Sequence, residues 1–183
     1  MIEAVKKWED SLTPEEKKAI KLFTGDWYTS IRKHLCKEEE LPADKLYLID
    51  SIDSALSKFK APYDILTYRT EGRLIDKALL ITTLKKLNSI EYKSYISTSL
   101  SKTVAINHIE TIKYDYPKSK SFVLINGNIL KNSNCGYLGN NLSSISGESE
   151  LLIIRNKKFI YDKNIIQDIQ GKEYIEIFGQ YEI

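Results

Sequence analysis

The sequence predicts an α+β fold in which helices come first and a sheet of mainly antiparallel strands follows. Three observations lead to this prediction: helical periodicity over residues 1 to about 60, short strand-like runs from residue 63 onward, and the absence of an internal repeat or a proline-rich linker. The chain has 183 residues, of which 42% are hydrophobic and 10% are aromatic. This is enough to bury a substantial core, so we expect a single domain over residues 1–183.

The helical part, about residues 1–60, contains a clear start signal. Thr13, Pro14 and Glu16 match a capping box with proline at the first helical position, and Gly25 ends the helix that they start. A second helix follows, with apolar residues at every fourth position: Trp27, Ile31 and Leu35. A third helix is expected from about residue 43 to residue 61, with Asp53 as the polar interruption of its apolar face.

The β-rich part, about residues 63–183, is expected to hold one helix and several strands. The helix is expected over 74–87, and the strands over 64–70, 95–99, 121–125, 148–155 and 158–162, with a final pair around 170–171. Residues 126–147 are rich in Asn, Ser and Gly and are expected to form a long loop. Long loops in compact domains are usually functional or mobile.

Charge and cysteine content exclude several classes of protein. The chain carries 27 Lys and Arg against 25 Asp and Glu, a net charge of +2, and no basic patch with interleaved aromatics, so a nucleic-acid partner is not expected. Cys36 and Cys135, with His34 and His108, have neither zinc-site nor disulfide-framework spacing. The apolar runs fall far short of the roughly 20 residues that a membrane span needs. The charged N-terminal residues do not form a secretory signal.

Glu148 and Glu150 are the first of three stretches that carry chemistry. They precede an apolar strand, and because side chains alternate across a strand, both carboxylates point to the same side if the strand has begun there. Like charges so placed repel each other. Either both carboxylates are solvated, or a cationic group lies between them.

The other two stretches are Ser97-Thr98-Ser99 and Tyr68-Arg69. The first is either an ordinary edge strand or a pair of hydroxyls that hold a neighbouring carboxylate in one rotamer. The second places an arginine on a strand, where its guanidinium either reaches solvent or meets an anion such as a phosphate.

The order of these stretches resembles the arginine-specific branch of the mono-ADP-ribosyltransferase toxins: aromatic-Arg, then aromatic-x-Ser-Thr-Ser, then Glu-x-Glu. Residues 23–35 are similar to the helix that caps the NAD site in actin-modifying binary toxins and Rho-modifying exoenzymes, and residues 136–138 resemble the family's substrate-recognition loop. The resemblance extends from about Leu12 to the C-terminus. It implies an ADP-ribosyltransferase fold, with N-terminal helices packed on a mostly antiparallel two-sheet β core.

The resemblance also assigns roles to individual residues. Glu150 would stabilise the cation-like ribose, Glu148 would meet the incoming guanidinium of the acceptor, and Ser97 would orient Glu150 as the third catalytic residue. Tyr137 would pack against the target protein. The residues expected to bind NAD, which is consumed as a substrate without any metal, are Arg69, Tyr28, Arg32, Thr98 and Ser99.

Two features depart from the family pattern or imitate it. Thr70 stands where several actin-modifying members have a second arginine. Residues 179–182 imitate the Gln-x-Glu of the Rho-modifying branch, but we expect them to form the final strand because no strand follows to anchor a carboxylate.

The implied activity is that of an NAD-dependent protein-arginine ADP-ribosyltransferase, a glycosyltransferase acting as a bacterial toxin or effector. Its substrate would be a host protein, with an actin-like target favoured. The enzyme would be secreted or delivered into a host cell, act in the host cytosol, and have a delivery component or an immunity protein as a further partner. Two alternatives stay open: an NAD glycohydrolase, and a non-catalytic docking domain with the same fold.

Overall fold

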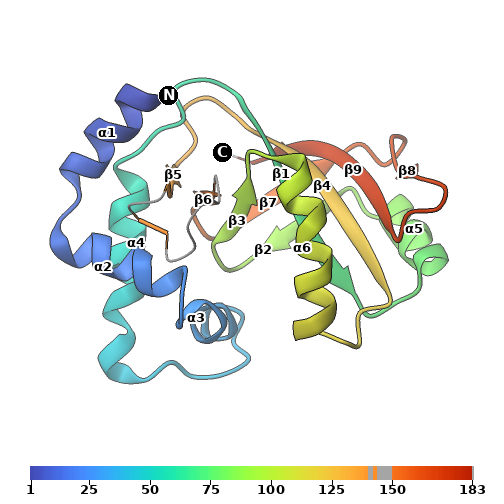
Figure 1. Ribbon diagram of the computed structural model, residues 1–183, viewed down its shortest axis with the longest axis horizontal. Coiled ribbons are helices and arrows are strands. Elements are labelled where there is room, and N and C mark those ends of the chain that lie inside the picture. The colour runs from blue at the N-terminus through green and yellow to red at the C-terminus, as the bar shows by residue number, and fades with distance from the viewer. Residues whose placement is uncertain (140–141, 144–149, 183) are drawn as a thin grey trace.

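The computed structural model describes residues 1–139, 142–143 and 150–182. Its N-terminal helices lie together on one side of the molecule (Figure 1). They are α1 (Ile2–Ser11), α2 (Pro14–Phe23), α3 (Tyr28–Leu35), the short 3₁₀ helix η1 (Ala43–Lys45) and α4 (Tyr47–Ser57). The expected helices are therefore confirmed. None of the helices in the described ranges is long and apolar enough to cross a bilayer.

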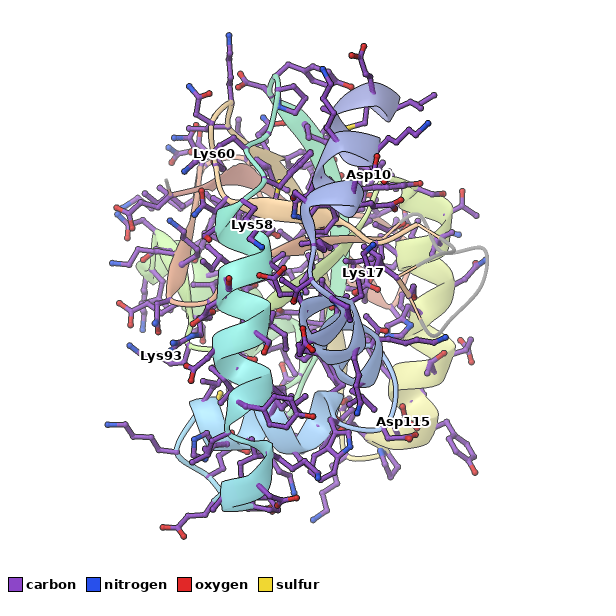
Figure 2. All side chains as sticks on the ribbon, turned by 90° about the vertical axis from the view of Figure 1, so that its left-hand side faces the viewer. Asp10, Lys17, Lys58, Lys60, Lys93 and Asp115 are labelled. Atoms are coloured by element: carbon purple, nitrogen blue, oxygen red, sulfur yellow. The ribbon has the colours of Figure 1, made fainter. Side chains whose placement is uncertain are left out.

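The start of α2 has the expected capping box. The Thr13 hydroxyl accepts from the Glu16 backbone N–H at 3.2 Å, and the Glu16 carboxylate accepts from the Thr13 N–H at 2.8 Å. Glu16 also accepts from Lys58 Nζ and from the Ser54 hydroxyl, both at 2.7 Å (Figure 2 labels Lys58 near the end of α4). The buried Glu16 carboxylate therefore ties α2 to α4.

Glu16→Gln is expected to lower the free energy of unfolding by about 1–2 kcal/mol at pH 7, because the buried side chain loses its charge-assisted partner. Burial opposes ionisation of Glu16, but Lys58, Ser54 and Thr13 together hold the pKa of the carboxyl below its usual value. A lowered folded-state pKa stabilises the protein above the unfolded-state pKa, and this contribution is lost as the pH falls. Urea denaturation at pH 7 and at pH 3 should show the difference between wild type and variant shrinking at pH 3. An equal difference at both pH values would contradict this.

The strands of the described residues join into one nine-stranded sheet in the order β2-β7-β9-β4-β1-β3-β6-β5, with β8 paired to β9. Among these pairings β4–β9 is parallel and the others are antiparallel. The strand bounds are β1 (Ile65–Arg73), β2 (Ser89–Tyr92), β3 (Ile96–Ser99), β4 (Ser121–Ile129), β5 (Cys135–Tyr137), β6 (Glu150–Ile153), β7 (Lys157–Tyr161), β8 (Gln167–Asp168) and β9 (Tyr174–Tyr181).

The connection between β1 and β3 divides this sheet into two parts. β1 pairs with β4 along its whole length, from Ile65 to Arg73, but it pairs with β3 only at Tyr68 and Ser99. The two sheets expected from the sequence are therefore two parts of one hydrogen-bonded sheet, joined at a single residue pair. Beyond that pair β1 and β3 are not hydrogen-bonded to each other as strands, and a cleft opens there.

Two further helices lie among the strands. α5 (Lys77–Lys86) is the helix expected over 74–87. α6 (Lys102–Asp115) is not among the expected elements, and its apolar residues Ala105 and Ile109 pack on Phe122 and Leu124 of β4. Figure 1 shows α6 crossing the sheet beside β1 and β4. This helix forms a wall of the cleft described below.

The expected loop over 126–147 is wrong for part of its length. Residues 126–129 continue β4, and residues 135–137 form β5. Asn126 is stable within a strand because its side-chain amide donates to the Glu176 carboxylate at 3.2 Å and to the Ile177 carbonyl at 3.3 Å. Gly127 leaves room for the Tyr181 ring, which would lie 2.5 Å from a Cβ at this position. Asn126, one of the polar residues that suggest a loop, therefore has buried hydrogen-bond partners in the sheet instead.

One hydrophobic core joins the helices to both parts of the sheet. It contains Trp8 of α1 and Leu56 of α4, Ile96 and Leu152 of the smaller part, and Ile177 of the larger part. This continuity supports the proposal that residues 1–183 form one domain.

Candidate active site

A cleft with a volume of about 770 Å³ lies between α3, α6 and the diverging strands β1 and β3. It brings together residues that are far apart in the sequence. The expected site residues that line it are Tyr28, Arg32, Arg69, Ser97, Thr98, Ser99 and Glu150. Glu148, the other expected catalytic carboxylate, lies outside the described residues.

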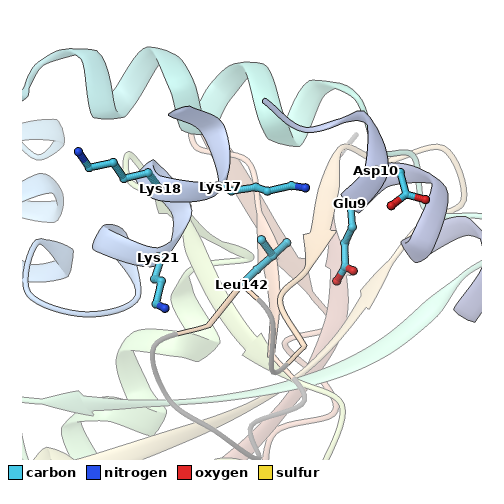
Figure 3. Close-up of a pocket in the computed structure, with 6 residues that line it drawn as sticks. All are labelled: Glu9, Asp10, Lys17, Lys18, Lys21 and Leu142. Atoms are coloured by element: carbon cyan, nitrogen blue, oxygen red, sulfur yellow. The ribbon is translucent and has the colours of Figure 1, made fainter. Parts of the chain in front are cut away.

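A second pocket of about 480 Å³ lies beside α1 and α2 (Figure 3). Its lining residues are Glu9, Asp10, Lys17, Lys18, Lys21 and Leu142. Of the described residues expected to form the site, none lines this pocket. The larger cleft is therefore the candidate active site.

Arg69 is held in a fixed orientation across the opening between β1 and β3. Its Nε donates to Glu71 Oε1 at 2.7 Å, and its Nη1 donates to the Ser97 carbonyl at 2.7 Å. The side chain is only 20% exposed. The guanidinium therefore does not extend into solvent, and its anionic partner in this structure is the Glu71 carboxylate.

Glu71 and Arg73 belong to the same face of β1 as Arg69, because residues two apart on a strand point to one side. Arg73 Nη2 donates to Glu71 Oε2 at 2.5 Å. Burial opposes ionisation of Glu71, yet Arg73 and Arg69 together lower the pKa of this carboxyl to about 2. Sequence reasoning missed Glu71. The i, i+2, i+4 spacing of charges from Arg69 was the available signal.

The strand β3 presents its three hydroxyl residues in alternation. Ser99 is paired with Glu150 and Ser97 with Leu152, so Ser97, Ser99 and Glu150 share one face of the sheet. Ser99 is thus the direct cross-strand neighbour of Glu150, and Ser97 is the diagonal one. Ser99 Oγ also accepts from the Ser101 N–H at 3.0 Å, just before α6 begins.

Thr98 points to the opposite face and is almost fully buried. Its hydroxyl donates to the Leu151 carbonyl at 2.8 Å. Although Thr98 lines the cleft, its hydroxyl therefore also links β3 to β6, the strand that carries Glu150.

Glu150 is the first residue of β6 and is 9% exposed. Its backbone carbonyl accepts from the Leu138 N–H at 2.9 Å, so its main chain is anchored on both sides, by β3 and by the end of β5. A carboxylate held in this way at the edge of a cleft can stabilise positive charge that develops on a bound molecule.

Helix α3 supplies the opposite wall. Tyr28 and Arg32 are four residues apart and therefore lie on one face of this helix, and both line the cleft. The Tyr28 ring packs edge-on against Phe23, with 5.3 Å between ring centroids. Arg32 Nη2 lies 3.6 Å from a carboxylate oxygen of Glu38.

Asp53 explains the polar interruption of the third expected helix. It accepts from the Tyr95 hydroxyl at 2.8 Å and, on both carboxylate oxygens, from Arg155, whose Nε lies 2.8 Å and Nη2 2.6 Å from Oδ2. Tyr95 immediately precedes β3 and Arg155 follows β6. The Asp53 side chain therefore ties α4 to the two strands that carry Ser97 and Glu150.

Tyr137 is expected on the substrate-recognition loop, and that placement is wrong. It lies in β5, paired with Leu151, and does not line the cleft. The strand fits here because Gly136 packs so closely that a Cβ would lie 2.5 Å from Trp8 and 2.8 Å from Leu56. Contact between Tyr137 and a target protein stays a prediction.

No group of three or more His, Cys, Asp or Glu side chains within residues 1–139, 142–143 and 150–182 is arranged to hold a metal ion. The groups that line the cleft are instead guanidinium, hydroxyl and carboxylate groups around a space of about 770 Å³. Guanidinium groups suit the anionic part of a ligand, and a carboxylate suits a part of the same ligand on which positive charge develops.

The fold is that of bacterial ADP-ribosylating toxins. Plx2a, an ADP-ribosyltransferase toxin from Paenibacillus larvae, matches with a TM-score of 0.79 and 24% identity, over 99% of this chain and 92% of that chain. BECa, an ADP-ribosylating toxin of a C. perfringens binary enterotoxin solved with NADH, matches with a TM-score of 0.76 and 22% identity, over 98% of this chain and 46% of that chain.

Comparison of the sequence assigns the chain to a particular family. The model of the ADP-ribosyltransferase exoenzyme family matches residues 2–180, and the chain belongs to this family. A curated relative, NAD(+)–arginine ADP-ribosyltransferase EFV of Enterococcus faecalis, is 33% identical over 156 residues, which cover 84% of this chain. The match spans 30% of that relative's length.

Proposed function

We propose that this chain is an NAD-dependent mono-ADP-ribosyltransferase that transfers ADP-ribose to an arginine of a host protein. The observation that carries the proposal is the single cleft that brings together Arg69, Ser97 and Glu150 from three different strands. Family membership and the activity named for the Enterococcus faecalis relative support it.

The chemistry follows from the bond that is broken. The glycosidic bond between nicotinamide and the ribose C1′ breaks, nicotinamide leaves with the electron pair, and an oxocarbenium-like sugar develops. Glu150 stabilises this positive charge more strongly in the transition state than in the ground state. Ser97, which shares a face with Glu150, orients its carboxylate. Arg69 holds the pyrophosphate, with Tyr28, Arg32, Thr98 and Ser99 as further NAD contacts.

The acceptor arginine needs a second carboxylate. A guanidinium is a poor nucleophile because it stays protonated. Glu148 orients it and accepts the proton that is released as its nitrogen forms the new bond to C1′. No metal takes part in these steps.

Glu148→Gln is expected to abolish transfer to arginine while nicotinamide release from NAD with water as acceptor continues at a rate within about threefold of wild type. Glu150 still serves the bond-breaking step in this variant. The two rates are measured separately, by incorporation of labelled ADP-ribose into an arginine-containing acceptor and by nicotinamide release without acceptor. Retained arginine transfer would remove Glu148 from its role. If nicotinamide release in wild type is equally fast with and without a protein target, the chain is an NAD glycohydrolase instead.

The target and its location belong to the same proposal. The Glu-x-Glu pattern favours an actin-like target, and a toxin of this family acts after secretion or delivery into the cytosol of a host cell. A separate delivery component and an immunity protein are further expected partners. Incubation of the chain and labelled NAD with host-cell lysate, followed by mass mapping, tests the target. An adduct on arginine is expected, and an adduct on asparagine or cysteine would overturn the acceptor assignment.

A further inference from the structure

Three charged side chains follow one another along one face of β1: Arg69, Glu71 and Arg73. One carboxylate joins the two guanidiniums, because Arg69 donates to Glu71 Oε1 and Arg73 donates to Glu71 Oε2. All three residues line the cleft. This arrangement holds two guanidiniums at a fixed spacing from each other.

The carboxylate in the middle is well suited to this positioning role. Glu71 is 9% exposed, whereas Arg69 is 20% and Arg73 31% exposed. With a pKa of about 2, Glu71 is ionised throughout the physiological range, so both contacts persist. The most buried member therefore holds the two more exposed cations.

The two cations keep donors for another partner. Glu71 and the Ser97 carbonyl engage Nε and Nη1 of Arg69, and within the described residues Nη2 of Arg69 has no hydrogen-bond acceptor. Nε of Arg73 likewise has no acceptor within the described residues, because Arg73 donates from Nη1 to the Gly72 carbonyl and from Nη2 to Glu71. Two positive charges and one negative charge leave the trio with a net charge of +1. A dinucleotide's pyrophosphate has two adjacent anionic groups, each of which a guanidinium binds well.

We propose that Arg73 binds the second phosphate of NAD beside Arg69, and that Glu71 is the positioning residue that holds both guanidiniums for the pyrophosphate. This inference rests on the proposed function, because it takes NAD as the ligand. Glu71 itself does not touch NAD in this arrangement. Its contribution is to fix two long side chains before the ligand arrives, which reduces the entropy lost on binding.

The kinetic signature of this role differs from that of a catalytic residue. The pyrophosphate is bound in the ground state as well as in the transition state, so its contacts lower KM and leave kcat almost unchanged. For nicotinamide release, Glu71→Gln and Arg73→Gln are each expected to raise KM for NAD about tenfold, with kcat within about threefold of wild type. In the Arg73→Gln background, Glu71→Gln should have a smaller effect, because one of the two guanidiniums it holds is already absent.

Glu16→Gln is the matched control, because Glu16 is also a buried carboxylate bound by a cation, but it lies outside the cleft. It should lower stability without changing KM. Arg73→Gln keeps the proposal testable if Glu71→Gln does not fold, since Arg73 is the most exposed of the three residues. A lowered kcat with unchanged KM, or unchanged values of both, in Arg73→Gln would overturn the inference.

Calorimetric binding of ADP separates this inference from the proposed function. ADP carries a pyrophosphate but has no nicotinamide bond to break. Wild type should bind ADP about tenfold more tightly than either variant. If wild type releases no nicotinamide but this difference in ADP affinity is found, the proposed function fails, and the role of Arg73 and Glu71 in pyrophosphate binding is supported. If wild type releases nicotinamide but wild type and variants bind ADP equally well, the role of Arg73 and Glu71 in pyrophosphate binding is wrong and the proposed function stands.

Discussion

Glu150→Gln is expected to lower the rate of nicotinamide release from NAD about a hundredfold or more, which corresponds to roughly 3 kcal/mol or more of lost transition-state stabilisation. The amide has nearly the same size and keeps one acceptor oxygen, but it has no charge to oppose the cation that develops on the ribose. Because this charge appears only as the bond breaks, kcat should fall while KM for NAD changes little. Single-turnover measurement of nicotinamide release, with NAD binding followed separately, checks both parts.

Glu182→Gln is the matched control for this prediction. Glu182 is the last residue of the Gln-x-Glu sequence at 180–182, which is similar to the motif of the Rho-modifying branch. It is exposed just after the end of β9. Tyr181 of the same segment is buried against Phe159, so this segment is part of the final strand and its packing, as expected. Wild-type activity is expected for Glu182→Gln. Loss of activity in Glu182→Gln together with an active Glu150→Gln would exchange the assignments of the two carboxylates.

Gly179→Ala is expected to lower the free energy of unfolding by about 3 kcal/mol or more, the upper part of the range for an overpacked core. A Cβ at this position would lie 2.0 Å from the Ile160 carbonyl oxygen and 2.7 Å from Tyr161 Cα, and both are backbone atoms that cannot rotate away. Gly179 is paired with Tyr161, so relief of the clash requires β7 and β9 to separate. Urea denaturation followed by circular dichroism measures the loss.

Gly171→Ala distinguishes this close contact from a general effect of replacing glycine. Gly171 has a φ of +75° in the connection between β8 and β9, and a Cβ there would meet nothing within 4 Å. Its substitution should therefore cost only about 1 kcal/mol, from backbone strain. Equal losses for Gly171→Ala and Gly179→Ala would show that the contact with β7 is not the cause.

Features that depend on neighbours in the sequence could be predicted. The capping box at Thr13 and Glu16 is an interaction between residues three apart, and the alternation along a strand places Ser97 and Ser99 on one side. The candidate site followed from the resemblance, whose motifs mark Arg69, Ser97 and Glu150. Each of these three residues does line the cleft.

Features that depend on distant partners could not be predicted in the same way. The polar segment that begins at Asn126 reads as a loop, because nothing in its own sequence shows that Glu176 will accept a bond from it fifty residues later in the chain. Tyr137 was misplaced for a similar reason, since the strand around it depends on packing against Trp8 and Leu56. Glu71 is marked in the sequence only by the alternating charges from Arg69 to Arg73, and its role depends on its contacts with these two arginines.

The single pair of residues that joins β1 to β3 has a consequence for how ligand specificity can diverge on this fold. Where a long backbone ladder crosses a site, its dimensions are set by main-chain geometry that every sequence shares. Here one pair, Tyr68 with Ser99, and one side-chain bond, from Arg69 to the Ser97 carbonyl, span the junction. A few substitutions at this junction between β1 and β3 can therefore change the shape of the cleft, while the hydrophobic core on either side is unchanged.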